Sequence, residues 1–309
     1  MKLKSLLLIL VVFFILKSVS SPYNGSYKNI SSTYAGTVAT AGRWVIVDQT
    51  GHQVLYNNSV TPLTFRTLTP HFSWWRMTTV DNVAIIRNML IGPQGEITQI
   101  DSTNNTWHGS PNNMPVTRVI PPAVFDAWSC AMGDTLISVC GTVTTYLPAT
   151  NSWTPQVQGP PNVLPSLWYV TIGNKVVTVR GEKMSTLVNG TWSAAVPGPG
   201  PASNDGTDVW VLSMGNILIS SFGKISKYTT SWSTPTQGLP YLTYNVGLPS
   251  NSTVVRDKWV CVADTLVISI RGQVCKLVNG VFTNVATRLP KVNGVNSGMY
   301  DQWFAAIKI

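Results

Sequence analysis

The stretch FDAWSCAMGDTLISVCGTVTTYLPATNSWTPQV, residues 125–157, decides how the rest of the chain is organised. A strand led by Trp128 reaches a tight Gly-Asp turn, and an apolar strand then ends at Gly141. The run VTTYLPATNSW follows and reads as two further strands. Short apolar and β-branched runs separated by turn residues are typical of antiparallel strands. We therefore expect this stretch to form one four-stranded unit.

The same pattern recurs along the chain, with a Trp leading each unit and an aromatic residue closing it. The leading tryptophans follow one another at intervals of 40 to 53 residues. A repeat of this length indicates a propeller or a solenoid. The predicted leading residues are Trp75, Trp128, Trp168, Trp210, Trp259 and Trp303. The predicted closing residues are Phe65, Trp107, Trp153, Trp192, Trp232 and Phe282.

The two ends of the chain fit together as parts of one unit. The repeats begin inside a unit that closes at Phe65 and end on a lone leading strand, DQWFAAIKI, at 301–309. If this strand completes the first unit, no long sheet edge stays unpaired. This predicts an all-β fold: a six-bladed β-propeller of four-stranded antiparallel blades, closed by its C-terminal strand. The alternative takes 34–42 as the first inner strand and Trp303 as the start of an incomplete seventh blade.

Two copies of the unit resemble the kelch repeat, the propeller family that includes the central domain of galactose oxidase. They are IDSTNNTWHGSPNNMP at 100–115 and YLPATNSWTPQVQGPP at 146–161, and the resemblance covers residues 43–309. The chain departs from the family because its second strand ends in one Gly instead of two. The resemblance implies a β-propeller, and it leaves function open because enzymes and binding proteins share this scaffold.

The N-terminus has the pattern of a secretory signal. Two lysines precede an apolar core of 11 residues, Leu6–Leu16, and small residues follow at Ser18 and Ser20. That core is too short for a typical membrane span, which needs about 20 apolar residues. We expect a signal peptide at 1–20, a polar lead-in at 21–33 and a propeller at 34–309. The protein would then be secreted without a span in the mature chain; alternatively, an uncleaved segment anchors it facing outside.

The chain carries a net positive charge and several N-glycosylation motifs. Loss of three leader lysines would reduce the formal charge from +9, the excess of 21 Lys and Arg over 12 Asp and Glu, to +6. The positive residues are scattered, which argues against nucleic acid as a partner. In a secreted chain, N-glycosylation is expected at some of the acceptor motifs. These motifs start at Asn24, Asn29, Asn57, Asn104, Asn189 and Asn251.

The long connections between units are the expected binding surface. They are rich in proline and should share one face with the turns between second and third strands. Function concentrates in loops on a rigid scaffold, so we predict a protein or glycan ligand on this face. The predicted contact residues are Phe125, Arg118, Tyr241, Tyr244, Arg256 and Tyr300.

A short oxygen-bearing residue stands two positions before each leading Trp. Because inner strands converge on the propeller axis, these residues should ring the mouth of the channel. They could jointly hold a divalent cation such as calcium, or each could cap its own turn by accepting a backbone hydrogen bond. Repetition in every unit favours the capping role. The six residues are Ser73, Asp126, Ser166, Asp208, Asp257 and Asp301.

The cysteine count is even, which in a secreted chain suggests disulfides. Cys130 and Cys140 lie on neighbouring strands of one hairpin, and we predict that they pair through a bulge. Cys261 and Cys275 lie two strands apart, beyond the usual Cα separation of about 7 Å. Their pairing stays open.

Catalytic motifs are scarce in the sequence. The three histidines, His52, His71 and His108, lack metal-ligand spacing, and there is no nucleophile elbow or phosphate-binding loop. We therefore predict a binding or adhesion module without a cofactor. The alternative is an extracellular carbohydrate-active hydrolase or lyase that uses the four aspartates at the channel mouth.

Overall fold

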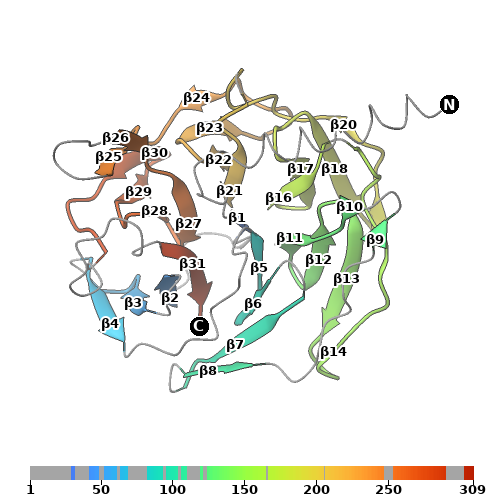
Figure 1. Ribbon diagram of the computed structural model, residues 1–309, viewed down its shortest axis with the longest axis horizontal. Helices are drawn as coiled ribbons and strands as arrows, with labels where there is room; N and C mark the ends of the chain where they lie inside the picture. Colours follow the sequence, from blue (N-terminus) through green and yellow to red (C-terminus); the bar gives the residue numbers. More distant parts are fainter. Residues whose placement is uncertain are drawn as a thin grey trace.

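The computed structural model describes residues 29–31, 42–48, 52–60, 63–68, 82–92, 95–103, 106–109, 119–120, 124–164, 166–204, 206–246, 253–289 and 303–309. All regular secondary structure in these ranges is β-strand. Most of the strands form six blades of four antiparallel strands each, which surround a central axis as a ring (Figure 1). The predicted six-bladed propeller is confirmed.

The blades are numbered along the chain, and their strands are given from the axis outwards. Blade 1 contains β31 (Trp303–Lys308), β2 (Arg43–Asp48), β3 (Gln53–Asn57) and β4 (Phe65–Leu68); blade 2 contains β5 (Asn82–Ile86), β6 (Met89–Ile91), β7 (Ile97–Asp101) and β8 (Thr106–Gly109). Blade 3 contains β11 (Trp128–Met132), β12 (Thr135–Ser138), β13 (Thr142–Leu147) and a split outer strand, β14 (Ser152–Trp153) and β15 (Val157–Gln158).

The remaining blades repeat this arrangement. Blade 4 contains β16 (Trp168–Ile172), β17 (Lys175–Thr178), β18 (Lys183–Val188) and a split outer strand, β19 (Thr191–Trp192) and β20 (Val196–Pro197). Blade 5 contains β21 (Trp210–Met214), β22 (Ile217–Ser220), β23 (Lys224–Lys227) and β24 (Thr236–Gln237). Blade 6 contains β27 (Trp259–Ala263), β28 (Leu266–Ser269), β29 (Val274–Val278) and β30 (Val281–Asn284).

The C-terminal strand closes the ring as the sequence predicts. β31 pairs antiparallel with β2, with Trp44 opposite Lys308 and Val47 opposite Ala305. Its Trp303 and Ile307 side chains are buried in the core that blades 1, 2 and 6 share. The seven-bladed alternative is therefore wrong, because the strand that begins at Trp303 completes blade 1.

The leading tryptophans join neighbouring blades. Trp210 is fully buried, and its backbone N–H donates to Val179 O of the preceding blade at 2.9 Å. Its indole N–H donates to Gly200 O at 2.8 Å. A Cβ on Gly181, whose φ is +75°, would lie 2.4 Å from the indole nitrogen of Trp210. In blades 3, 4 and 6 the single Gly after the second strand, Gly141, Gly181 or Gly272, thus permits both the turn and the approach of the next Trp.

Blade 2 departs from the predicted pattern at its inner strand. This strand begins at Asn82, so Asn occupies the position that Trp holds in the other blades. The residues predicted to lead this unit, Ser73 and Trp75, lie outside the described residues. The prediction that the inner strand starts at Trp75 is wrong, because the strand begins seven residues later.

A short N-terminal strand lies inside the ring. β1 (Asn29–Ser31) pairs in parallel with β5 and lies close to the inner strands of all six blades (Figure 1). The segment predicted to be a polar lead-in thus contributes a strand to the centre of the propeller. The predicted leader, residues 1–20, lies outside the described residues. Among the described residues, no helix is long and apolar enough to cross a membrane.

All four cysteines are buried and free, so the predicted Cys130–Cys140 disulfide does not form. The register explains this result: Cys130 lies opposite Ile137, three residues before Cys140. Cys261 lies on β27 and Cys275 on β29, with β28 between them. Two strand spacings are about 9.6 Å, more than a disulfide can bridge.

The thiols should be inert in the folded protein. Burial raises the pKa of Cys130 and of Cys140 to about 12 and that of Cys275 to about 11, and burial also raises the pKa of Cys261. Thiolates, which are the reactive form, are therefore scarce near pH 8. We expect native protein to react very slowly with a disulfide reagent, and all four thiols to react after unfolding in guanidinium without a reductant. Fewer than four reactive thiols in the unfolded chain would contradict four free cysteines.

Candidate functional site: the inter-blade loop face

The connections between blades lie on one face of the ring together with the turns between second and third strands. Gly159, Gly200, Gly238 and Leu289 each donate a backbone hydrogen bond to the Gly that ends the second strand of the preceding blade, at 2.9–3.0 Å. This arrangement is the one that the sequence predicts. We call this surface the loop face.

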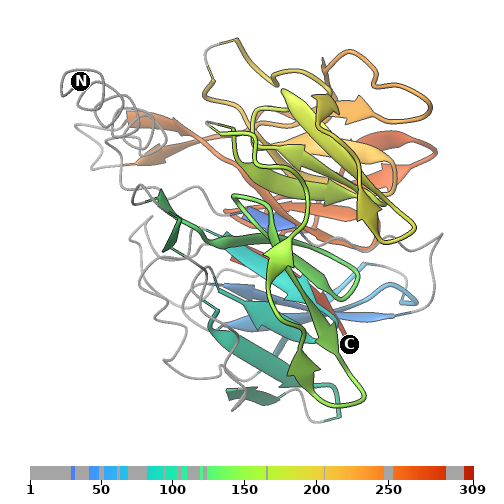
Figure 2. The same cartoon turned by 90° about the vertical axis from the view of Figure 1, so that its right-hand side faces the viewer.

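Two extra hairpins belong to these connections. One joins β9 (Val119–Ile120) to β10 (Val124–Phe125), and the other joins β25 (Thr243–Val246) to β26 (Thr253–Arg256). In Figure 2 the dark-green β9–β10 hairpin and the orange β25–β26 hairpin both project to the left of the ring, whereas the C-terminus lies on its right. The loop face therefore projects beyond the four-stranded blades next to blades 3 and 6.

The aspartates two positions before the leading tryptophans accept hydrogen bonds from residues of their own blades. Asp208 is buried, and its Oδ2 accepts a hydrogen bond from the Ser220 hydroxyl at 2.8 Å. Its Oδ1 accepts from the Ser221 hydroxyl and from the Phe222 N–H, both at 2.9 Å. The Ser220 oxygen in turn accepts from the N–H of Lys224 at 2.8 Å. One carboxylate thus joins the start of the first strand to the turn between the second and third strands.

The same arrangement recurs in blades 3 and 6. The Ser138 hydroxyl donates to Asp126, and the Ser269 hydroxyl donates to Asp257, each at 2.7 Å. Burial raises the pKa of the Asp257 carboxyl, while the hydrogen bonds that it accepts oppose this effect. Blade 4 differs, because Ser166 hydrogen-bonds to Glu182. These described members of the predicted ring therefore hold their own blades together instead of converging on one site.

No group of three or more acidic, His or Cys side chains that could hold a metal ion occurs within the described ranges. Asp301 and Ser73, the other members of the ring, lie outside those ranges. The divalent-cation site stays a prediction, which a calcium-dependent rise in the unfolding temperature would support.

An arginine held by two aromatic rings stands on the loop face between blades 5 and 6. The Arg256 guanidinium carbon lies 5.2 Å from the centre of the Phe222 ring and 5.1 Å from that of Tyr241. The two rings are 6.4 Å apart and inclined at 49°. Arg256 is exposed and makes no ion pair within the described residues, and the Tyr241 side chain is 50% exposed. We call these three residues the arginine–aromatic cluster.

The arginine–aromatic cluster is preorganised to bind an acidic group. A guanidinium stacked on aromatic rings is favourable by about 0.5–1 kcal/mol per ring at exposed sites. Stacking restricts the side chain but uses none of its five N–H donors, which match a carboxylate or sulfate in geometry. The cluster can therefore bind an acidic group with little further loss of side-chain freedom.

Two further arginines lie on the same face. Arg180 and Arg271 each precede the Gly that ends the second strand of their blade, as Phe222 does in blade 5. Arg180 is exposed and Arg271 is half-buried. Glu182 is an exposed acid nearby in the chain, and it already accepts a bond from Ser166. The loop face of blades 4 to 6 is therefore suited to an acidic partner.

The structure brings together two of the six residues predicted for this face, Tyr241 and Arg256. Sequence reasoning missed Phe222, although its place directly before a second-strand Gly marks it as a loop-face residue. Tyr244 lies in β25 and Phe125 in β10, of which the backbone is described. Arg118 and Tyr300 lie outside the described residues.

The predicted glycosylation motifs are distributed over several parts of the fold. Asn57 ends β3, and Asn189 is exposed in the turn between β18 and β19. Asn29 is the first residue of β1, the strand inside the ring. Asn24, Asn104 and Asn251 lie outside the described residues, and modification at all six stays a prediction.

Comparison with known proteins adds only distant likenesses. No family model matches the chain, and no curated protein matches it. It is similar in structure to BBS1N in complex with ARL6DN, at 12% identity and a TM-score of 0.41, over 90% of this chain and 87% of that chain. It is also similar to the WD40 β-propeller domain of Doa1, at 13% identity and a TM-score of 0.36, over 86% and 85%. A third likeness is to U3-55K, at 12% identity and a TM-score of 0.33, over 84% and 85%.

The chain is a β-propeller. Its own strand pairing and its closed ring show this. Membership of the kelch family stays a prediction.

Proposed function

We propose that this propeller is a secreted or cell-surface binding module that recognises an acidic protein or glycan through the loop face of blades 5 and 6. The observation that carries the proposal is the arginine–aromatic cluster, in which an exposed guanidinium is oriented by two rings and has no ion pair within the described residues. The adjoining hairpin β25–β26 adds contact surface at Val254, which is 65% exposed.

Several features of the chain support this proposal over catalysis. The described aspartates at the channel mouth are buried and accept hydrogen bonds from their own blades, so they do not present open carboxylates to a substrate. The groups that depart from the repeat on the loop face are an arginine and two aromatics, residue types enriched in binding hot spots. Secretion rests on the predicted leader at 1–20, and the kelch resemblance is compatible with a binding role.

A binding experiment with a matched charge variant tests the proposal. The purified, labelled protein is applied to glycan arrays and to cell surfaces, and retention is compared with that of Arg256→Gln. The control is Lys276→Gln, which removes one charge from an exposed position on β29 of blade 6. Hydrogen bonds to a charged group contribute about 1.5–3 kcal/mol, so Arg256→Gln should weaken binding about tenfold or more.

The control variant should bind as the wild-type protein does, and added salt should weaken binding because the recognised groups are exposed charges. Tyr241→Ser should also weaken binding, since it removes one of the rings that orient the guanidinium. Equal retention of Arg256→Gln and Lys276→Gln would show that the cluster is not the binding site. Absence of retention on every array and cell surface would contradict the binding role itself.

A further inference from the structure

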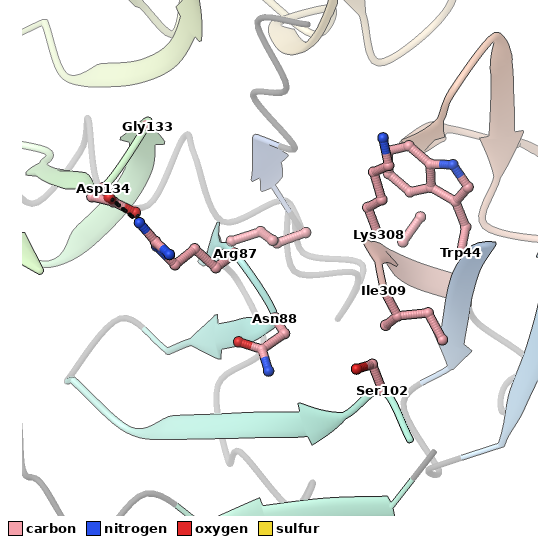
Figure 3. A pocket seen from close by; sticks show the side chains of 10 residues that line it. Trp44, Arg87, Asn88, Ser102, Gly133, Asp134, Lys308 and Ile309 are labelled. Atoms are coloured by element: carbon pink, nitrogen blue, oxygen red, sulfur yellow. Dashed lines mark hydrogen bonds and ion pairs between the residues drawn. The ribbon is translucent and has the colours of Figure 1, made fainter. Parts of the chain in front are cut away.

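The face opposite the loop face contains a cavity that the repeats do not predict. Its volume is about 570 Å³, and it lies where blades 1, 2 and 3 meet. Cavities of roughly 300–1,000 Å³ are the usual size for small-molecule sites. The walls come from the ends of β31 and β2 and from the first hairpin turns of blades 2 and 3, as Figure 3 shows.

The turns beside this cavity depart from the repeat. In blades 2 to 6 the inner strand is followed by a turn whose first residue has a left-handed backbone, and in blades 3, 4 and 5 this residue is glycine, with φ between 56° and 59°. Blade 6 has Asp264 there, an acidic residue that tolerates this conformation better than most. Blade 2 instead has Arg87, with φ at 53°. In blade 1, Lys308 is the last residue of β31 and follows the first residue of its inner strand by the same number of positions as these turn residues do.

Two neighbouring blades thus carry a basic residue at the position where three others carry glycine. A left-handed backbone is unfavourable for a long side chain such as arginine, so Arg87 lowers the stability of its own turn. Strain of this kind collects at functional sites. Lys308 and Arg87 both line the cavity.

The partner of Arg87 is a second departure from the repeat. The next turn position holds Asn88, Asn174 and Asn216 in blades 2, 4 and 5, and each donates to a backbone carbonyl of its own blade. Blade 3 has Asp134, which cannot donate. Asp134 accepts two bonds from Arg87, from Nε at 2.7 Å and from Nη2 at 2.9 Å. The unlike residues therefore meet across the boundary between blades 2 and 3 (Figure 3).

Stability alone does not account for this pair. The side chains of Arg87 and Asp134 are 51% and 31% exposed. Exposed ion pairs contribute little to stability, and this one is made by a residue in an unfavourable backbone conformation. The pair instead fixes the direction of the guanidinium and leaves its remaining N–H donors, on Nη1 and on the second Nη2 position, for a ligand.

The chemistry of the walls indicates the class of ligand. Arg87, paired with Asp134, stands on one side of the cavity and Lys308 on the other (Figure 3). Asn88 and Ser102 add polar groups, and the Ser102 carbonyl is held by Arg43 at 3.1 Å. Ile85, Ala306 and the buried Trp44 supply apolar surface. Arg87 and Lys308 are the cationic side chains of the lining, and Asp134, which Arg87 binds, is the acidic one; Ile309 also lines the cavity.

We propose that this cavity binds a small organic anion, with its acidic group between Arg87 and Lys308 and its apolar body against Ile85 and Ala306. The site lies on the opposite face from the arginine–aromatic cluster and is independent of the proposed function. It is a binding site, and no reaction is assigned to it.

The test uses a probe of known shape, naphthalene-2-carboxylate, and its neutral amide as the matched ligand control. Titration calorimetry on the full-length protein should give saturable binding of the carboxylate with a dissociation constant of about 1 mM or tighter, the affinity typical of a ligand of this size. The amide has the same shape without the charge, so it should bind at least tenfold more weakly.

Variants then assign the site. Arg87→Gly introduces the residue that blades 3, 4 and 5 carry, so the turn should form without strain while the guanidinium is lost. It should weaken carboxylate binding at least tenfold, and Arg87→Gln provides the same test if the glycine variant folds poorly. Lys276→Gln, remote from the cavity, should bind as the wild-type protein does.

Three results would overturn the proposal. They are no saturable binding of the carboxylate to the wild-type protein, equal affinity for the carboxylate and the amide, and unchanged affinity in a folded Arg87 variant. Retention of the loop-face partner in the Arg87 variants is expected in every case, so this test and that of the proposed function fail separately.

Discussion

Deleting residues 303–309 should unfold the entire domain. The deletion removes the inner strand of blade 1, with its pairing to β2, the buried Trp303 and Ile307 side chains, and the backbone bond from Trp303 to Ile270 O of blade 6. Truncating buried Trp and Ile side chains costs about 3–5 and 2–5 kcal/mol, before the lost strand pairing is counted. The sum is on the order of 10 kcal/mol, which equals the total stability of a typical domain.

Circular dichroism during heating measures this effect. The truncated protein should show no cooperative transition, and a peptide of residues 301–309 added in excess should restore one. A control peptide with Trp303→Ser and Ile307→Ser should not, because it lacks the buried side chains. A truncated protein that keeps the wild-type unfolding temperature would contradict closure by β31.

Asp208→Ala should lower the free energy of unfolding by about 3 kcal/mol. The change leaves the hydroxyls of Ser220 and Ser221 and the N–H of Phe222 without their acceptor. Buried donors without partners cost about 1–3 kcal/mol each, and the rotation of hydroxyl groups recovers part of this. Denaturant unfolding of the variant and the wild-type protein gives the difference.

Asp208→Asn is the matched control for charge. The amide oxygen can still accept from Ser221 and Phe222, but the amide nitrogen would face Ser220, which already accepts from Lys224. We expect a loss of about 1 kcal/mol, between the alanine variant and the wild-type protein. Equal and small losses in both variants would show that the carboxylate does not join the strands.

The ring can be predicted from the sequence because each repeat places the same residue types at the same packing positions. Trp168, Trp210 and Trp303 each pack beside a glycine of the preceding blade, so the spacing of the leading tryptophans reports the blade length. The hydrogen bond between Asp and Ser also has a sequence signal, because the Ser follows the Asp by 12 positions in three blades. The pairs are Asp126 with Ser138, Asp208 with Ser220 and Asp257 with Ser269.

The remaining features could not be read from a repeat. β1 pairs with β5 over a sequence separation of 53 residues and has no repeated counterpart, so no pattern marks it. The arginine–aromatic cluster combines Phe222, Tyr241 and Arg256 from a turn, a connection and a hairpin, and only the folded ring sets their distances. Both candidate sites lie where the residues of one blade differ from those at the same positions in the other blades. Such differences can be identified only when the blades are superimposed.

A footprint of the bound protein tests most directly the claim that recognition takes place on the loop face. Hydrogen exchange is followed in the protein alone and in complex with the partner that the arrays identify. The account predicts slower exchange in residues 237–246 and 253–256 and around Phe222, with no change in the turns at Arg87 and Gly133 on the opposite face. Protection confined to those opposite turns, with unchanged exchange in 237–246 and 253–256, would contradict it.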